Sequence, residues 1–125
     1  MINMEVVHVV EGDVVLRETL RLLLSAEGFD VRIYASAPAF LREVDSTVSG
    51  CVIADMFAPI ATEIELLCEI EERRLNFPVI IMSDNDDAFG AAEAIKLGAV
   101  GLLKKPIEPN VLVAAIWEAL GHGAT

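Results

Sequence analysis

The chain has 125 residues, of which 54% are hydrophobic, so its length fits one domain and its apolar content excludes a disordered protein. Its formal net charge is −11, from 20 acidic and 9 basic side chains, and this excludes direct binding of nucleic acid, which relies on a basic patch. The apolar runs are too short to cross a membrane and no signal peptide is visible, so we expect a cytoplasmic protein without membrane contact.

Short β-rich runs alternate with helical patterns through the first half of the chain. The run VVHVV predicts a strand at Val6–Val10, and leucines at helical spacing predict a helix over residues 13–27. A second strand is expected at Asp30–Tyr34, where apolar and polar residues alternate. A serine suited to capping a helix then predicts a short helix over residues 36–44.

The second half of the chain continues this alternation. The first of its strands is apolar throughout, which is typical of a strand buried on both faces. We expect strands at residues 51–54, 79–82 and 100–103, and helices at 62–73, at 86–97 and from Pro109 to a stop at Gly121.

Five strand-then-helix units predict an α/β fold, with a parallel sheet covered by helices on both faces. Right-handed crossovers leave few topologies for such a chain, and the flavodoxin-like doubly wound sheet is among them. In these folds the functional site lies at the carboxyl ends of the strands, where the strand order reverses.

Chemically active side chains follow four of the predicted strands. Glu11 follows the first strand, Asp55 the third, Ser83 the fourth and Lys105 the fifth. Paired carboxylates suit Mg²⁺, which prefers hard oxygen ligands, whereas a lysine and a hydroxyl suit a phosphoryl group. Asp55 is therefore a candidate nucleophile that forms an aspartyl phosphate.

Four segments at these strand ends carry a family resemblance. They are VVEGD, VIADMFAP, IMSD and GAVGLLKKP. In this order and spacing the chain resembles the response-regulator receiver domain of two-component signalling, and it is most similar to receivers that precede helix-turn-helix domains. The resemblance implies a flavodoxin-like (βα)5 sheet with strand order 2-1-3-4-5. It also implies that residues 1–125 form a single receiver domain without an effector domain, acting as a switch and not as a turnover enzyme.

The resemblance also implies how a phosphoryl group is received and sensed. Asp55 would be the phosphoacceptor for a sensor histidine kinase, and Ser83 and Lys105 would contact the phosphoryl group. Leu102 occupies the switch position, where a Tyr or Phe ring usually turns inward. Phosphorylation would then change the binding of a downstream protein or effector domain.

The expected metal site departs from the family pattern at its acidic pair. The resemblance implies that Mg²⁺ is held by Glu11, Asp55 and the main-chain carbonyl of Phe57, with Asp13 as a further candidate. Gly12 stands where these domains usually carry a second acid. Because the number of charged ligands tunes such sites, we expect weakened Mg²⁺ binding.

Three other functions stay open at this point. Gly12 and Leu102 favour a degenerate receiver that acts as a phosphorylation-independent interaction domain. A flavin-binding protein is disfavoured because the segment EGDVVLRE is acidic where a phosphate loop is needed. A Mg²⁺-dependent phosphohydrolase lacks a second catalytic acid beside Asp55, because Phe57 stands two residues on.

Self-association is a separate expectation from the last helix. Its apolar residues cover more than one face, which leaves a surface available for a homodimer. They are Val111, Val113, Ile116, Trp117 and Leu120.

Overall fold

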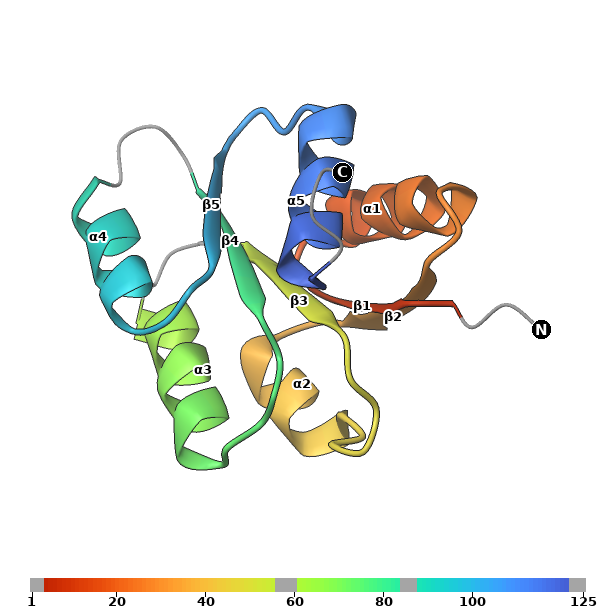
Figure 1. Ribbon diagram of the computed structural model, residues 1–125. Helices are drawn as coiled ribbons and strands as arrows, with labels where there is room; N and C mark the ends of the chain where they lie inside the picture. Colours follow the sequence, from red (N-terminus) through yellow and green to blue (C-terminus); the bar gives the residue numbers. More distant parts are fainter. Residues whose placement is uncertain (1–3, 56–60, 84–87, 122–125) are drawn as a thin grey trace.

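A computed structural model describes residues 4–55, 61–83 and 88–121. Five parallel strands form one sheet in the order β2-β1-β3-β4-β5, which confirms the predicted fold class and strand order. The sheet lies between two layers of helices, with α1 and α5 on one face and α2, α3 and α4 on the other (Figure 1). The strands are β1 (Val6–Val10), β2 (Asp30–Tyr34), β3 (Cys51–Asp55), β4 (Val79–Ser83) and β5 (Gly101–Lys104).

The helices agree with the predicted ranges to within two residues at the bounds that were predicted numerically. They are α1 (Val14–Ala26), α2 (Ala37–Glu43), α3 (Ala61–Glu72), α4 (Ala88–Lys96) and α5 (Pro109–Ala119). None of the described helices is long and apolar enough to cross a membrane.

Local sequence explains where several helices begin and end. The side chains of Asp13 and Ser36 cap α1 and α2, each accepting a main-chain N–H from three residues further on. Gly28 and Gly98 follow α1 and α4 with φ angles of 96° and 108°, the left-handed conformation that favours glycine after a helix. Arg74 takes the same role after α3 with a φ of 55°, although it has a side chain.

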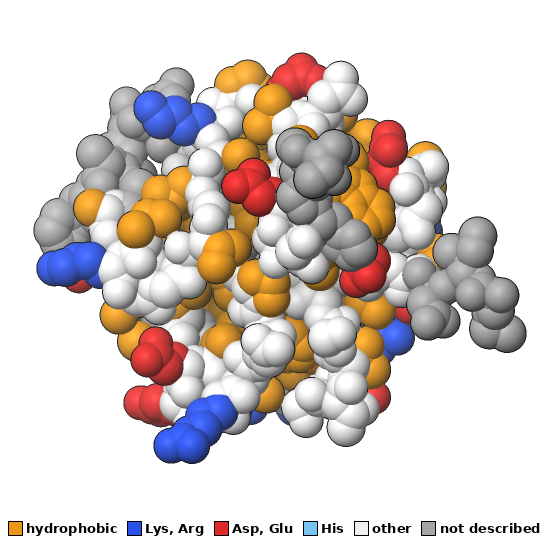
Figure 2. All heavy atoms as spheres, viewed as in Figure 1, with side chains coloured by type: hydrophobic (Ala, Val, Ile, Leu, Met, Phe, Trp, Pro, Cys, Tyr) orange, Lys and Arg blue, Asp and Glu red, His pale blue; other side chains and the backbone are white. Residues whose placement is uncertain are grey.

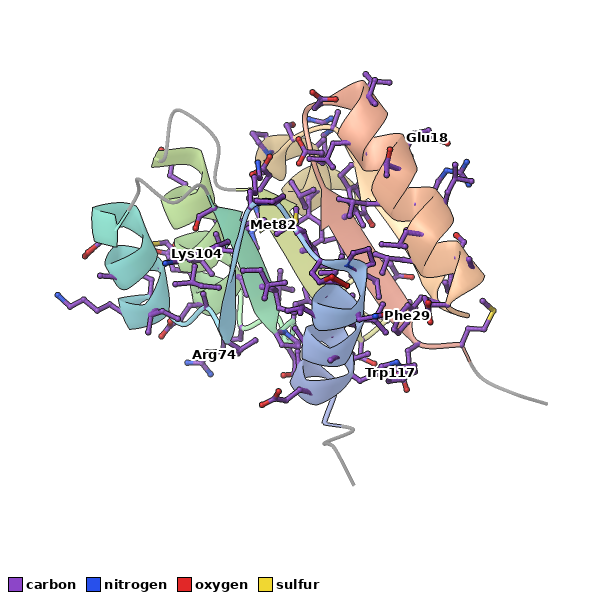
Figure 3. The ribbon with its side chains drawn as sticks, turned by 90° about the horizontal axis from the view of Figure 1, so that it is seen from above. Glu18, Phe29, Arg74, Met82, Lys104 and Trp117 are labelled. Atoms are coloured by element: carbon purple, nitrogen blue, oxygen red, sulfur yellow. The ribbon has the colours of Figure 1, made fainter. Side chains whose placement is uncertain are left out.

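Two hydrophobic clusters, one on each face of the sheet, make up the core. The central strands β1, β3 and β4 are buried along their whole length, and for β3 the apolar sequence had predicted this. On the α1 and α5 side, Phe29 packs against Trp117 with ring centroids 4.8 Å apart (Figure 3).

The opposite face holds a buried histidine. His8 lies in the middle of β1 with no exposed surface, and its Nδ1 is 3.1 Å from the hydroxyl of Tyr34. The rings of Phe40 and Phe77 lie around it, with centroids 5.6 and 5.2 Å away. Burial is the main cause that lowers the pKa of His8 to about 4, and the nearby charge of Arg32 adds to the effect. His8 is therefore a neutral core residue at neutral pH.

Candidate functional site

Four polar side chains meet at the carboxyl edge of the sheet. Parallel strands end at the same edge, so residues that end neighbouring strands become neighbours. Asp55 ends β3 and Ser83 ends β4, while Glu11 directly follows β1 and Lys105 directly follows β5. Glu11, Asp55 and Ser83 are buried although they are polar. The structure thus brings together the residues that were predicted to converge.

Asp55 and Lys105 form an ion pair inside this edge. Lys105 Nζ lies 2.5 Å from Asp55 Oδ1, and the Asp55 side chain is only 4% exposed. The main-chain N–H of Lys105 also donates to the main-chain carbonyl of Ser83 at 2.8 Å, which fixes the β5 end beside the β4 end. A carboxylate loses much of its hydration when it is buried, and the lysine ammonium offsets that loss.

Glu11 is a second buried carboxyl group beside Asp55. Its Oε1 accepts the main-chain N–H of Asp13 at 3.0 Å, whereas its Oε2 is buried without a hydrogen-bonding partner among the described residues. Burial is the main cause that raises the pKa of Glu11 to about 7, and the adjacent carboxyl of Asp55 raises it further. The Asp13 N–H and the charge of Lys105 act in the opposite direction.

These two carboxyl groups have the character of a cation site. A buried carboxyl with one unsatisfied oxygen next to a second carboxylate is a donor set that hard cations such as Mg²⁺ prefer. Within residues 4–55, 61–83 and 88–121, no group of three or more His, Cys, Asp or Glu side chains is placed to hold a metal. The third predicted ligand, the carbonyl of Phe57, lies outside the described residues.

The remaining predicted residues lie around this centre. Asp13 is exposed, and its Oδ1 caps α1 by accepting the N–H of Leu16 at 3.0 Å. Gly12 is exposed too, and a Cβ added there would lie 3.5 Å from the carbonyl oxygen of Ala35, an ordinary contact. Leu102 is half-buried in β5 and packs against the core on the α2, α3 and α4 side.

One residue of this region was not predicted from the sequence. Arg17 of α1 is half-buried, and its Nη1 donates to the main-chain carbonyl of Glu11 at 3.1 Å. An arginine in a polar stretch of an amphipathic helix is ordinary, and no motif marks it. The only available signal was its place one turn after the predicted helix start, close to the strand end.

The sheet order and the buried acid–lysine pair at the point where that order reverses define a receiver domain. Residues 7–117 match the family model of the response regulator receiver domain, and the chain belongs to this family. The resemblance predicted from the strand-end segments is thereby confirmed.

The relatives include receiver domains of transcriptional regulators. The transcriptional regulatory protein FixJ of Bradyrhizobium diazoefficiens is 38% identical over 114 residues, covering 91% of this chain and 56% of that protein. The solved structure of FixJ-N superposes with a TM-score of 0.87 at 32% identity and covers 99% of both chains. Full-length FixJ from B. japonicum gives a TM-score of 0.85 at 35% identity, covering 96% of this chain and 59% of that one. The chain therefore spans little more than half the length of these regulators.

Proposed function

We propose that this receiver domain accepts a phosphoryl group on Asp55 from a sensor histidine kinase and thereby switches the binding of an output partner. The observation that supports this most is the buried pair of Asp55 and Lys105, 2.5 Å apart at the carboxyl edge of the sheet. An aspartate held beside a lysine at such a site matches the needs of a nucleophile that carries a doubly charged phosphoryl group.

The proposed transfer uses three side chains. A carboxylate oxygen of Asp55 forms a bond to phosphorus as the bond between phosphorus and the kinase histidine breaks, and the imidazole leaves. Lys105 Nζ then pairs with a phosphoryl oxygen, and the Ser83 hydroxyl, buried at the end of β4, donates a hydrogen bond to another. Because Asp55 is the reacting group, the domain takes part in one transfer per signal and is not a turnover enzyme.

Mg²⁺ is the cofactor we propose for this transfer, and Glu11, Asp55 and the Phe57 carbonyl would hold it. When bound, Mg²⁺ offsets the negative charge of the phosphoryl oxygens. The unsatisfied Oε2 of Glu11 supports this proposal. Asp13 is the weaker candidate because its Oδ1 already caps α1. With Gly12 in place of a second acid, binding should be weaker than is usual for the family.

Phosphorylation is tested by incubating the protein with a small phosphodonor and Mg²⁺ and measuring the intact mass. We expect one added phosphoryl group on the wild type and none on Asp55→Asn. Asp45→Asn is a matched control, because Asp45 is an exposed aspartate that bonds only its neighbour Thr47 in the hydrogen bonds described. No added mass on the wild type, with the cognate kinase also failing, would contradict the proposal.

Asp13→Asn separates the two possible roles of Asp13. Asparagine caps helices as well as aspartate does, so the helix start is preserved while the negative charge is lost. We expect unchanged Mg²⁺ dependence of phosphorylation in this variant. A marked rise in the Mg²⁺ requirement would make Asp13 a ligand.

The partners follow from the same proposal. The relatives are named transcriptional regulatory proteins, so we propose that the output partner is a transcriptional effector, attached or separate. A shift of the surface around Ser83 and Leu102 would carry the signal to it. We place the kinase encounter in the cytoplasm, without direct contact of this domain with nucleic acid or membrane. That residues 1–125 form a single receiver domain stays a prediction.

The homodimer expected from the last helix also stays a prediction. Of its apolar residues, Val111 is half exposed, whereas Val113, Trp117 and Leu120 pack against the core on the α1 and α5 side. Figure 2 shows apolar and charged side chains interspersed on the side of the molecule where β5 faces the viewer. Light scattering with and without a phosphoryl mimic would decide the matter, and a monomer in both states would remove the dimer.

A degenerate receiver that works without phosphorylation is the second candidate. Gly12 and the ringless Leu102 favour it. The intact Asp55–Lys105 pair and the inward position of Glu11 favour the phosphorylated switch instead.

A further inference from the structure

The turn between β1 and α1 is closed by hydrogen bonds that meet at Glu11. Its main-chain N–H donates to the carbonyl of Tyr34 at 3.0 Å, and its own carbonyl accepts from Arg17 Nη1 at 3.1 Å. Its Oε1 accepts the main-chain N–H of Asp13 at 3.0 Å. Three of its four polar groups are therefore held, and Oε2 is left buried beside Asp55 without a partner among the described residues.

Of the hydrogen bonds described at Glu11, the one from Arg17 is donated by a side chain, and it comes from the first turn of α1. The main-chain N–H of Arg17 bonds to the Asp13 carbonyl at 2.9 Å, which fixes its backbone in the first turn of α1. From there its guanidinium reaches back across the turn to the Glu11 carbonyl. A hydrogen bond from a charged donor is stronger than a neutral one, and the planar guanidinium keeps its direction.

Without this contact, the Glu11 carbonyl loses its arginine donor, and the Asp13 N–H is the described hydrogen bond that still holds the carboxyl inward. A buried carboxyl group with an unsatisfied oxygen regains hydration when it turns toward water. Gly12, next in the chain, has no side chain to restrict such a rotation of the backbone. The space at Gly12 is open enough for a side chain, so packing there does not hold the turn either.

We propose that Arg17 is a positioning residue that holds Glu11 inside the site, so that a single acid at this turn presents a cation ligand where the family usually has two. The inference rests on the proposed function for its Mg²⁺ consequence. Its structural part, the restraint of the turn, holds for the metal-free protein and is testable there. Among the described residues, the Arg17 guanidinium bonds the Glu11 carbonyl, which is not a reacting atom.

Amide hydrogen exchange without metal tests the restraint, with Arg17→Met as the variant. Methionine keeps an unbranched apolar stem but cannot donate. Arg21→Met is the matched control, because Arg21 lies one turn further along α1 and pairs with the half-exposed Glu18. Losing one charge-assisted bond should speed exchange at the amides of Glu11 and Asp13 by about tenfold in Arg17→Met. Equal exchange at these amides in Arg17→Met and wild type overturns the inference, whatever Mg²⁺ does.

A Mg²⁺ titration followed by amide NMR tests the consequence for the site. Supporting groups around metal ligands typically change metal affinity by about tenfold or more, so we expect about a tenfold loss in Arg17→Met. Arg21→Met should match the wild type, and Arg17→Lys, which keeps one charged donor, should recover part of the loss. A purely structural role would change the unfolding free energy without this graded recovery. Full affinity in Arg17→Met overturns the inference.

A double variant links the restraint to the missing acid. Gly12→Asp supplies a second carboxylate, so the site should depend less on Glu11, and the loss caused by Arg17→Met should shrink to about threefold in that background. An undiminished loss would contradict the link to Gly12. A third outcome separates the two proposals. If exchange is faster in Arg17→Met than in the wild type, but the wild type binds no Mg²⁺, the proposed function is refuted and the restraint by Arg17 stands.

Discussion

Because His8 is buried, we expect the unfolding free energy of this protein to fall in acid by an amount that can be calculated. The pKa of His8 is lowered from 6.5 to about 4, mainly because burial removes the hydration of the charged form. Between these two values the unfolded chain binds a proton at His8 that the folded chain does not. Stability is therefore complete above about pH 7, falls as pH drops through this window, and loses nothing further from His8 below pH 4.

The size of the effect follows from the same two pKa values. Each pH unit below 6.5 should remove about 1.4 kcal/mol of unfolding free energy, and the whole window about 3 kcal/mol. The Arg32 charge contributes to the shift, so Arg32→Met should make the loss smaller. In the folded protein, His8 Nδ1 also shares a hydrogen bond with the hydroxyl of Tyr34, and this bond is lost on unfolding.

The assay is urea unfolding of the wild type and of His8→Leu, followed by the fluorescence of Trp117, which packs against Phe29. Leucine does not titrate, and the carboxyl groups common to both proteins cancel in the difference. From about pH 7.5 to pH 5, the difference in unfolding free energy should shift by about 2 kcal/mol against the wild type. His8→Gln, which keeps a polar group near Tyr34, provides a second reference. A difference that does not change with pH in either comparison would refute the reasoning.

Three further predictions concern single positions outside the site. Arg74→Gly should raise the unfolding free energy by about 0.5–1 kcal/mol, because glycine adopts the left-handed conformation after α3 without strain; equal or lower stability in urea would contradict this. Gly50→Ala should lower it by about 1–3 kcal/mol, because the new Cβ would lie 2.6 Å from the carbonyl oxygen of Val6; an unchanged urea midpoint would argue against that clash. An alkylating reagent near pH 8 should modify half-buried Cys68 first, because burial raises the pKa of Cys51 to about 12; mass mapping that finds Cys51 modified as fast would count against it.

Most of the fold was predictable because its signals are local. The alternation of β-rich runs with helical patterns predicted the described strands and helices in order, and parallel strands place their carboxyl ends at one edge. That geometry allowed Glu11, Asp55, Ser83 and Lys105 to be grouped before any distance was known. The strands β3 and β4 each end one residue later than predicted, at Asp55 and Ser83.

The tertiary structure determined the contacts and the burial of the site residues, which the sequence pattern left open. The 2.5 Å contact between Asp55 and Lys105 depends on the crossover that places β5 beside β4. Burial distinguishes Glu11 from Asp13, since the Glu11 side chain turns inward whereas Asp13 is exposed and caps α1. The hydrogen bond from Arg17 to the Glu11 carbonyl spans only six residues, yet it too depends on how the start of α1 is placed against the end of β1. These outcomes depend on the balance between hydration and hydrogen bonding at positions brought together by the fold, and no short stretch of sequence carries that balance.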